Sequence, residues 1–438
     1  MNYLLRFKKT VAFASIYLLA SQLLNAQSTI NTSAGQINTV TTAVPFLRIV
    51  PDARAGGMGD VGLATPTDAN GLYINPAKMA FIDKDFGVAV TFSPWLKSLV
   101  NDIYLANINA YYKVKKQQTI GISLRYFSLG NITFTDVNGT ETGQFRPNEF
   151  AIDVHYARKL GDYFSIAASL RFIYSNLAGG QQVSGNLVKP GIAGSGDISG
   201  YFRKTFHENE EHKLEHELAI GICISNIGSK ISYTDNLNKD FIPTNLGIGA
   251  GYTLGIDKHN SVGIYLDANK LLVPTPNPND PTRAWKQESS IKGIFTSFND
   301  APGGTKEEFN EVTWGVGAEY MYNKQFGVRF GYFYENPLKG NRQFLTAGLT
   351  VKYSVVGLNF SYLIPTTIQR NPLDNTLRFT LLFDFVKGGK KSTQNNTGIS
   401  LVPDEPKKKK EKKTEEAKPV QETKPVIKEN KLEPVEPK

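Results

Sequence analysis

The chain has 438 residues, of which 40% are hydrophobic and 20% are charged, and its formal net charge is +9. Part of the positive charge lies at Arg6, Lys8 and Lys9 and part in a mixed-charge C-terminal tail, so no basic face points to nucleic acid. The single cysteine, Cys223, excludes an internal disulfide as the element that holds the fold together.

Residues 1–26 predict a secretory signal peptide, with basic residues, an apolar stretch and a small residue, Ala26, at the expected cleavage site. No later run reaches the roughly 18 apolar residues that a transmembrane helix needs. The residue directly after the cleavage site is Gln27 and not a cysteine, which excludes a lipoprotein anchor. Residues 27–44 are polar and rich in Thr and Asn, and we expect them to form a flexible segment in the periplasm.

Residues 45–85 show neither the alternation of a strand nor the stripe of an amphipathic helix. They are rich in glycine, alanine and small polar residues. Irregular backbone is tolerated at membrane depth only where protein or water surrounds it. We therefore expect residues 45–85 to form a plug inside a β-barrel. The residues expected to shape this plug are Arg48, Pro51, Asp52, Arg54, Gly57, Gly59, Asp60, Asn75, Pro76 and Ala77.

From Phe86 to Val386 the pattern changes to a period of two. In the segment 164–174, apolar residues at even positions alternate with smaller or charged ones such as Ser169 and Arg171. Apolar-out, polar-in alternation over about ten residues is typical of outer-membrane barrels. The sequence therefore predicts an all-β transmembrane barrel of the outer membrane, with about 14 antiparallel strands over residues 86–386.

The expected connections between these strands alternate in length. Short connections are predicted at residues 113–117, 159–162, 204–215, 255–260, 323–325 and 354–355, and longer loops at 129–147, 175–193, 227–243, 272–311, 335–343 and 365–375. Outer-membrane barrels have short periplasmic turns and long outer loops. An even number of strands then places both chain termini in the periplasm.

Residues 387–438 consist mainly of Lys, Glu, Pro and Thr. Such a segment cannot bury enough apolar surface to fold alone, so we expect a disordered periplasmic tail. A solvated spacer is the plainer interpretation. A contact to peptidoglycan or to a periplasmic protein is the alternative.

Three motifs have plainer interpretations than the chemistry they suggest. The run Gly-Met-Gly-Asp-Val-Gly at 57–62 matches a dinucleotide-binding pattern but lacks the flanking strand and helix, so its glycines indicate close packing. His212 and His216 could share a metal only on a helix, and a charged turn is favoured. His155 is expected to face the lumen beside Asp153, with no serine motif for catalysis. We expect neither an enzyme nor a metal or other cofactor.

Four aromatic residues in the expected outer loops are candidate contacts for exported proteins or other partners. Trp285, Phe295 and Phe298 follow a proline-rich stretch in the longest loop. Exposed aromatic residues among polar ones can anchor a partner. A loop that folds over its own barrel mouth is an equal alternative. Trp95, in the first loop, is equally suited to the aromatic girdle at the membrane surface.

The plug sequence carries a family resemblance. Asp68, followed by Asn75-Pro76-Ala77 and then by the expected barrel, resembles the FadL-type superfamily of outer-membrane transporters. The string from Phe46 to Asp60 resembles one branch more closely, the PorV (LptO) proteins of the type IX secretion system of Bacteroidetes. The resemblance extends from residue 45 to residue 386 and does not include the tail.

This resemblance implies a non-enzymatic role in protein secretion. PorV-type proteins take exported cargo, recognised by its C-terminal signal domain, from a giant translocon barrel of the SprA or Sov type. They carry it to the surface attachment complex, where a PorU-type sortase removes the signal and joins the cargo to lipopolysaccharide. The expected partners are therefore the translocon, the sortase and attachment complex, cargo signal domains, and outer-membrane lipid and lipopolysaccharide.

Two other functions stay open. A FadL-like transporter of hydrophobic compounds would need an apolar groove among the outer loops and a lateral opening in the wall. The polar, proline-rich stretch at 274–281 argues mildly against such a groove. A barrel enzyme acting on lipid A would centre on His155, but no set of serine, histidine and acid can be specified.

Overall fold

The structure is a computed structural model that describes residues 37–95, 102–183, 186–207, 215–234, 239–278, 280–367 and 375–386. The expected signal peptide, the first part of the segment after it, and the C-terminal tail lie outside the described residues. Within the described part of the chain, no helix is both long enough and apolar enough to cross a membrane.

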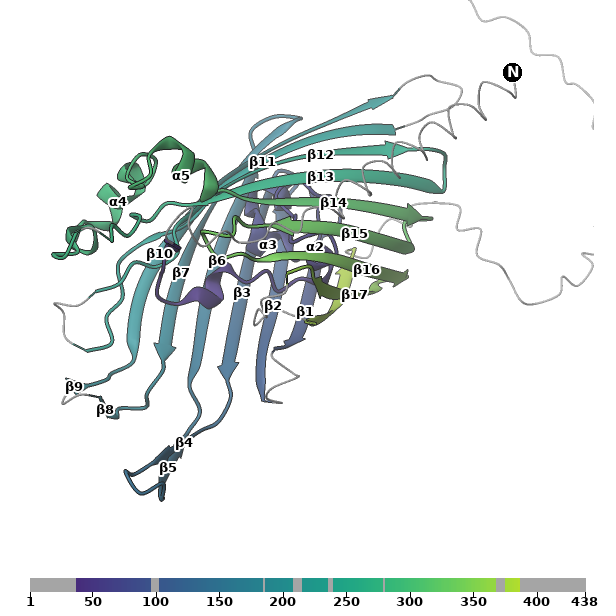
Figure 1. Ribbon diagram of the computed structural model, residues 1–438. Helices are drawn as coiled ribbons and strands as arrows, with labels where there is room; N and C mark the ends of the chain where they lie inside the picture. The colour runs from purple at the N-terminus through teal and green to yellow at the C-terminus, as the bar shows by residue number, and fades with distance from the viewer. Residues whose placement is uncertain are drawn as a thin grey trace, which may run out of the picture. The chain divides into compact units, whose positions relative to one another are not determined.

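Fourteen antiparallel strands form one closed barrel, as the sequence predicts (Figure 1). The last strand pairs with the first, with Phe385 opposite Phe86, and this pairing closes the sheet. The wall strands are β1 (Phe86–Pro94), β2 (Ile103–Lys115), β3 (Gln118–Leu129), β6 (Asn148–Lys159), β7 (Phe164–Asn176), β10 (Gly191–His207), β11 (Glu215–Gly228), β12 (Asn245–Gly255), β13 (Asn260–Leu271), β14 (Thr313–Tyr322), β15 (Phe326–Tyr334), β16 (Gln343–Tyr353), β17 (Val356–Pro365) and β18 (Leu377–Phe385).

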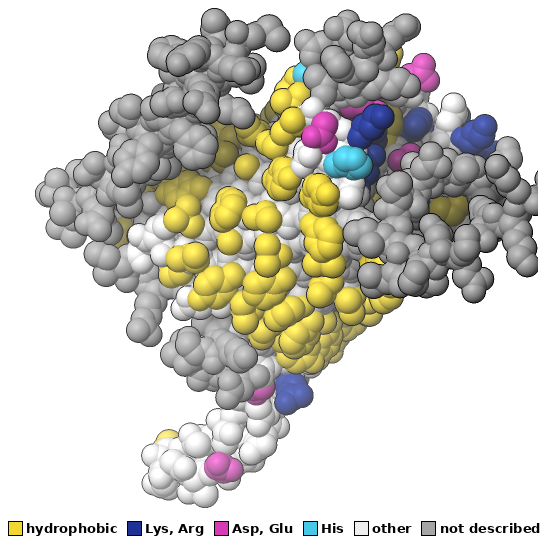
Figure 2. All heavy atoms as spheres, turned by 90° about the vertical axis from the view of Figure 1, so that its right-hand side faces the viewer, with side chains coloured by type: hydrophobic (Ala, Val, Ile, Leu, Met, Phe, Trp, Pro, Cys, Tyr) yellow, Lys and Arg dark blue, Asp and Glu magenta, His cyan; other side chains and the backbone are white. Residues whose placement is uncertain are grey.

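The wall presents apolar side chains outside and polar ones inside. On β7, Leu170 is 75% exposed whereas its neighbour Arg171 is buried, and on β15 Phe330 is exposed whereas Arg329 is buried. Figure 2 shows apolar side chains gathered in a broad field over the wall, with charged side chains toward its margins. An exposed apolar surface of this extent is expected where the surrounding solvent is lipid.

The connections alternate in length around the barrel, as the sequence also predicts. The short ones are residues 116–117, 160–163, 208–214, 256–259, 323–325 and 354–355, and the long ones are 95–102, 130–147, 177–190, 229–244, 272–312, 335–342 and 366–376. We name the two ends of the barrel the short-turn end and the long-loop end. In outer-membrane barrels these ends face the periplasm and the cell exterior, respectively.

The long loops contain elements of their own. β4 (Ile132–Thr135) and β5 (Glu141–Phe145) form a hairpin, and β8 (Gln182–Val183) pairs with β9 (Asn186–Leu187). Asp136 turns the first hairpin by accepting hydrogen bonds from the backbone N–H groups of Asn138 and Thr140. The loop between β13 and β14 contains η3 (Ala284–Gln287), α4 (Ser290–Thr296) and α5 (Thr305–Asn310) (Figure 1).

Residues 45–85, called the plug from here on, lie inside the barrel and contact the inner face of the wall. The plug contains η1 (Pro45–Arg48), α2 (Ala53–Gly56), α3 (Gly71–Ile74) and η2 (Pro76–Phe81). Asp52 caps α2 by accepting from two backbone N–H groups, and Asn75 caps η2 by accepting from one. The sequence predicts no helix here. These helices have at most six residues, too few to show a helical stripe.

The segment before the plug corrects one expectation. The sequence predicts a flexible periplasmic segment over residues 27–44, but its described part lies against loops at the long-loop end. The backbone N–H of Asn38 donates to Leu338 O at 3.1 Å, and that of Ala43 donates to Phe241 O at 2.9 Å. The described chain therefore begins at the end that faces the cell exterior. It crosses the lumen through the plug and reaches β1 at the short-turn end.

Candidate functional site

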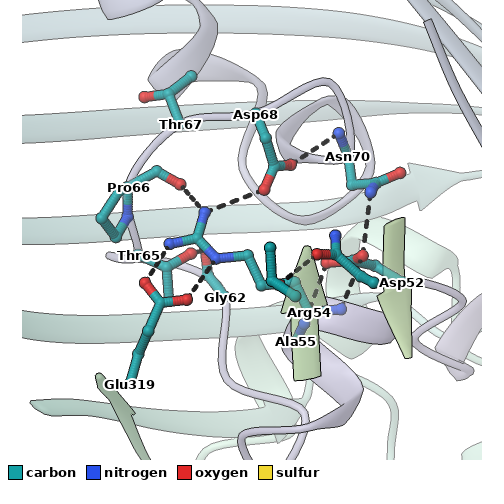
Figure 3. Close-up of polar contacts among 12 residues, drawn as sticks. Asp52, Arg54, Ala55, Gly62, Thr65, Pro66, Thr67, Asp68, Asn70 and Glu319 are labelled. Atoms are coloured by element: carbon teal, nitrogen blue, oxygen red, sulfur yellow. Dashed lines mark hydrogen bonds and ion pairs between the residues drawn. The ribbon is translucent and has the colours of Figure 1, made fainter. Parts of the chain in front are cut away.

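A buried cluster of charges around Arg54 fixes the plug to the wall (Figure 3). Arg54 donates to both carboxylate oxygens of Glu319 on β14, at 2.8 and 3.0 Å. Within the plug it donates to Asp68 Oδ2 at 3.0 Å and to Pro66 O at 2.7 Å. Arg329 on β15 also donates to Glu319, at 2.5 Å. Because removal of one partner would leave an uncompensated buried charge, the cluster opposes separation of plug and wall.

The turn at Gly59 and Asp60 brings the plug backbone directly onto the wall. Their φ angles are 69° and 62°, in the left-handed region. Gly59 N–H donates to Thr346 Oγ1 at 2.8 Å, and Asp60 accepts from Arg378 at 2.7 Å. A Cβ atom added to Gly331 on β15 would lie 2.1 Å from the plug backbone. Only glycine fits on the wall at that point.

Two further expected plug residues lie in the same region. Pro51 is buried and precedes Asp52, the residue that caps α2. Gly57 lies against Gly348 on β16, where an added Cβ atom would be 3.1 Å from Gly57 Cα. Asp52, besides capping α2, accepts a hydrogen bond from the side chain of Asn70 at 2.9 Å. The polar residues of the plug therefore pair with one another as well as with the wall.

The run Asn75, Pro76 and Ala77 joins the end of the plug to β7 and β10. Ser165 Oγ on β7 donates to Ala77 O at 2.7 Å. Ala77 N–H donates to Ser199 Oγ on β10 at 3.1 Å. Pro76 occupies the first position of η2, where a missing N–H is harmless. The plug is thus attached to the wall at this run as well as at Arg54.

A cavity of about 120 Å³, with both polar and apolar lining residues, lies between the plug and the long-loop end. Its lining includes Arg48, Asp60, Asn226, Asp267 and Arg342. Asp267 accepts from two backbone N–H groups of the plug, at 2.7 and 2.9 Å. The charges and amides in this lining bind water or polar groups well, and apolar residues such as Leu63 and Phe333 form the rest of it.

The wall is irregular where β7, β10 and β11 meet. The pairing of β10 with β11 shifts register next to Gly196. On the lumen side of this place, Arg171 binds Asp153 at 2.6 Å and Asp197 at 2.9 Å. On the lipid side lies an apolar notch whose lining includes Leu170. The charged cluster therefore separates the notch from the lumen.

His155 lies among polar residues of the wall. It is 1% exposed, and its two ring nitrogens lie 3.0 Å from Ser123 Oγ and 2.7 Å from Ser169 Oγ. A serine hydrolase needs an acid on the second nitrogen of its histidine. Here a serine occupies that position, and Asp153 is bound by Arg171 instead. The arrangement is that of a polar residue held in the barrel interior.

The histidines near the third short turn do not form the helical pair considered from the sequence. His216 lies on strand β11 and not on a helix, and its ring centroid is 5.9 Å from that of Tyr252. His212 lies outside the described residues. Among the residues that the structure does describe, no group of three or more His, Cys, Asp or Glu side chains could hold a metal ion.

The four candidate loop aromatics lie in different surroundings. Trp95 is half-buried and packs edge-on against Phe127, with 5.3 Å between the ring centroids. Trp285 is half-buried in η3. Phe295 and Phe298 are 74% and 49% exposed. Only the last two present large apolar surfaces to a partner, whereas Trp95 packs against the barrel's own wall.

Two exposed residues next to these were not singled out from the sequence. Ile291 on α4 is 58% exposed and precedes Phe295 by four residues, so both lie on one helical face. Phe309 on α5 is 65% exposed. The four-residue spacing between Ile291 and Phe295 is the only sequence signal that could have identified Ile291. Nothing local distinguishes Phe309 from a buried residue.

A closed barrel with an apolar outer face and a lumen occupied by its own N-terminal segment is a plugged β-barrel of the outer membrane. A family model described as "Type IX secretion system protein PorV" matches residues 32–278. Because this match covers more than half of the chain, the protein belongs to the PorV family. It is an outer-membrane component of the type IX secretion system.

Solved structures with a similar barrel have low sequence identity to this chain. The Ralstonia pickettii toluene transporter TbuX is 13% identical, with a TM-score of 0.39, and the match covers 77% of this chain and 98% of that one. The P. putida toluene transporter TodX is 9% identical, with a TM-score of 0.42 and coverage of 76% and 98%. A Pseudomonas aeruginosa FadL homologue is 11% identical, with a TM-score of 0.37 and coverage of 80% and 99%. A comparison with curated protein sequences gives no match.

Proposed function

We propose that this protein binds exported proteins carrying a C-terminal secretion signal and shuttles them from the translocon barrel to the surface attachment complex. There a sortase removes the signal and joins the cargo to lipopolysaccharide, so this protein itself performs no chemistry. The observation that carries the proposal is the family match over residues 32–278, a range that contains the whole plug and the wall strands as far as β13.

The plug supports binding at the long-loop end in preference to passage through the lumen. Two hydrogen bonds hold it to the wall on either side of its middle: Ala53 N–H donates to Thr380 Oγ1 at 3.0 Å, and Ser165 Oγ donates to Ala77 O at 2.7 Å. The buried pair of Arg54 and Glu319 lies between them. Moving the plug would require these contacts to break together, which is costly for buried charges. Cargo would therefore remain outside the barrel.

The loop between β13 and β14 is the proposed contact surface for cargo or for a partner barrel. Its base is fixed, because Lys270 binds Glu308 and Glu311 at 2.9 and 2.6 Å, and Lys339 binds Glu311 at 2.9 Å. Its α4 region, away from this base, carries the exposed side chains of Ile291, Phe295 and Phe298. A fixed base lowers the entropy lost when this apolar region binds, which favours affinity.

Deletion of the gene tests the proposed function. We expect proteins that carry the secretion signal to accumulate in the periplasm or to be released without attachment to lipopolysaccharide. We also expect an affinity pull-down from outer membrane to contain the translocon barrel and the sortase. Normal surface display of cargo in the deletion strain would contradict the proposal. Full-length protein restored from a plasmid serves as the control.

A transporter of hydrophobic compounds is the second candidate function. The apolar notch over Gly196 supports it, since a passenger that leaves a barrel sideways needs a break in the wall. The charges of Arg48 and Arg342 in the lining of the cavity above the plug oppose it. Uptake of fatty acid into liposomes that contain the purified protein would favour this candidate. Uptake no faster than in protein-free liposomes would remove it.

A further inference from the structure

We propose that a pocket at the long-loop end binds the ammonium or guanidinium group of a lysine or arginine side chain from the exported protein. This inference rests on the proposed function and adds a recognition chemistry to it. The pocket has a volume of about 400 Å³ and lies between the segment 41–45 and the long-loop ends of β3, β6 and β7. The loop between β11 and β12 forms its remaining side through Tyr233 and Asp240.

Glu149 gives the pocket a buried carboxylate that is only partly paired. It is 2% exposed, and its Oε1 accepts from Ser175 Oγ at 2.6 Å. Ser175 Oγ in turn accepts from the Tyr233 hydroxyl at 2.9 Å, so its one proton is committed to Glu149. Among the described residues, no further hydrogen bond reaches Oε2 and no cation pairs with Glu149. A buried carboxylate in this state gains most from a cation supplied from outside.

The other lining residues select a cation with an apolar stem. Asp240 adds a second carboxylate, half-exposed at the rim and 3.0 Å from Lys286. Tyr233 adds an aromatic ring, a group whose face attracts ammonium and guanidinium ions. Among the described residues that line this pocket, none is Lys or Arg. Asp240 is already paired with Lys286, so Glu149 is the carboxylate left for a cation, and the lining favours a basic side chain.

The position of the pocket favours a polypeptide as the source of this basic group. The pocket is at the end that faces the cell exterior, where the proposed function places the exported protein. Its largely apolar lining, which includes Val44 and Leu129, suits the methylene stem of lysine or arginine. The charged head would then reach Glu149 Oε2 while the backbone of the exported protein stays outside.

The substitution Glu149→Gln tests the inference with the full-length protein in detergent. It removes the charge and keeps an oxygen that can accept from Ser175. We expect the dissociation constant for a purified cargo signal domain to rise by about tenfold to a hundredfold. The matched control is Glu141→Gln on β5, an exposed acid at the same end of the barrel, which should leave the constant unchanged. The heat-dependent mobility of each variant in SDS gels verifies that its barrel is folded.

A pair of small probes separates this inference from the proposed function. Each probe is titrated into each protein in a calorimeter. We expect n-pentylammonium to bind the wild type but not the Glu149→Gln variant. We expect neutral n-pentanol to bind both proteins equally. Equal binding of n-pentylammonium to both proteins would overturn the inference. A signal domain that binds both proteins equally would overturn it too, while the proposed function would stand. A signal domain that does not bind the wild type at all would instead refute the proposed function.

Discussion

Arg54 in the plug and Glu319 on β14 form a two-pronged ion pair, with contacts of 2.8 and 3.0 Å and side chains that are 9% and 5% exposed. The two residues are 265 positions apart in the chain. A bidentate pair with this little exposure holds one geometry and tolerates the loss of neither partner. The plug and the wall are therefore expected to fold as one unit.

Replacing Glu319 with Gln should destabilise the barrel by about 3–5 kcal/mol, because Arg329 loses its acidic partner and Arg54 keeps only Asp68. The measurement is the temperature at which the folded form disappears in heat-dependent SDS gels. The control, Glu217→Gln, breaks a half-exposed pair with Arg203 and should cost at most about 1 kcal/mol. Equal effects of the two substitutions would show that the buried pair does not fix the plug.

Replacing Gly331 with Val should displace the plug, because its Cβ atom would lie 2.1 Å from the plug backbone. Overpacking of this kind costs about 1–3 kcal/mol, and a displaced plug should open a path for ions. Conductance of the purified protein in planar bilayers measures that path. The matched control is Gly194→Val on β10, where an added Cβ atom meets nothing within 4 Å. Low conductance in both variants would argue against the close contact.

The loop between β13 and β14 should lose stability as the pH rises from about 4 to 6. Burial, together with the nearby charges of Glu308 and Glu311, raises the pKa of Asp300 to about 6. An acid whose pKa is higher in the folded state than in the unfolded state penalises folding once it ionises in the unfolded state. Asp300 is half-buried, so the penalty above pH 6 should be about 1 kcal/mol after allowance for solvent screening.

Hydrogen exchange in the loop, corrected for intrinsic rates, checks this pH dependence. The variant Asp300→Asn should match the wild type at pH 4 and should protect the loop better at pH 7. If the exchange rates of the two proteins differed equally at pH 4 and pH 7, ionisation of Asp300 would not be the cause of the difference.

Replacing Phe295 and Phe298 with Ser should weaken the complex with cargo or with the translocon and leave the barrel intact. Aromatic anchors of an interface contribute about 2 kcal/mol or more, which corresponds to roughly a thirtyfold loss of affinity. Ile256→Ser is the matched control, since Ile256 is 50% exposed but lies in a turn at the short-turn end. Affinity measured with the purified partner should fall only for the loop variant. A fall for Ile256→Ser alone would assign binding to the opposite end.

The wall of the barrel could be predicted from the sequence because its signal is local. Apolar and polar side chains alternate along each strand, and the apolar ones face lipid. Leu170 and Arg171 on β7 are an example. The alternating lengths of the connections then provide an independent check of the strand number. Short loop elements such as α4 escaped prediction, because seven residues are too few for a helical period to appear.

The contacts inside the barrel could not be predicted, because no local pattern encodes them. The partner of Arg54 is a strand residue far along the chain, and only the closed sheet brings it near. The polar composition of the segment containing Asn38 predicts flexibility, whereas the structure holds this segment against the loops. Polar residues can also be held by loop groups, as Asn38 is by Pro276 O and Glu307, and composition does not report such contacts.

The central claim is that the plug stays in place while the protein works. Two cysteine pairs can tie the plug to the wall on either side of its middle, Ala53 with Thr380 and Ala77 with Ser165, in a Cys223→Ser background. The measurement is surface display of cargo by cells carrying this variant, with its crosslinks verified by mass spectrometry. A stationary plug predicts equal display from the oxidised and the reduced protein. Loss of display on oxidation, restored by a reductant and absent in single-cysteine controls, would contradict the claim.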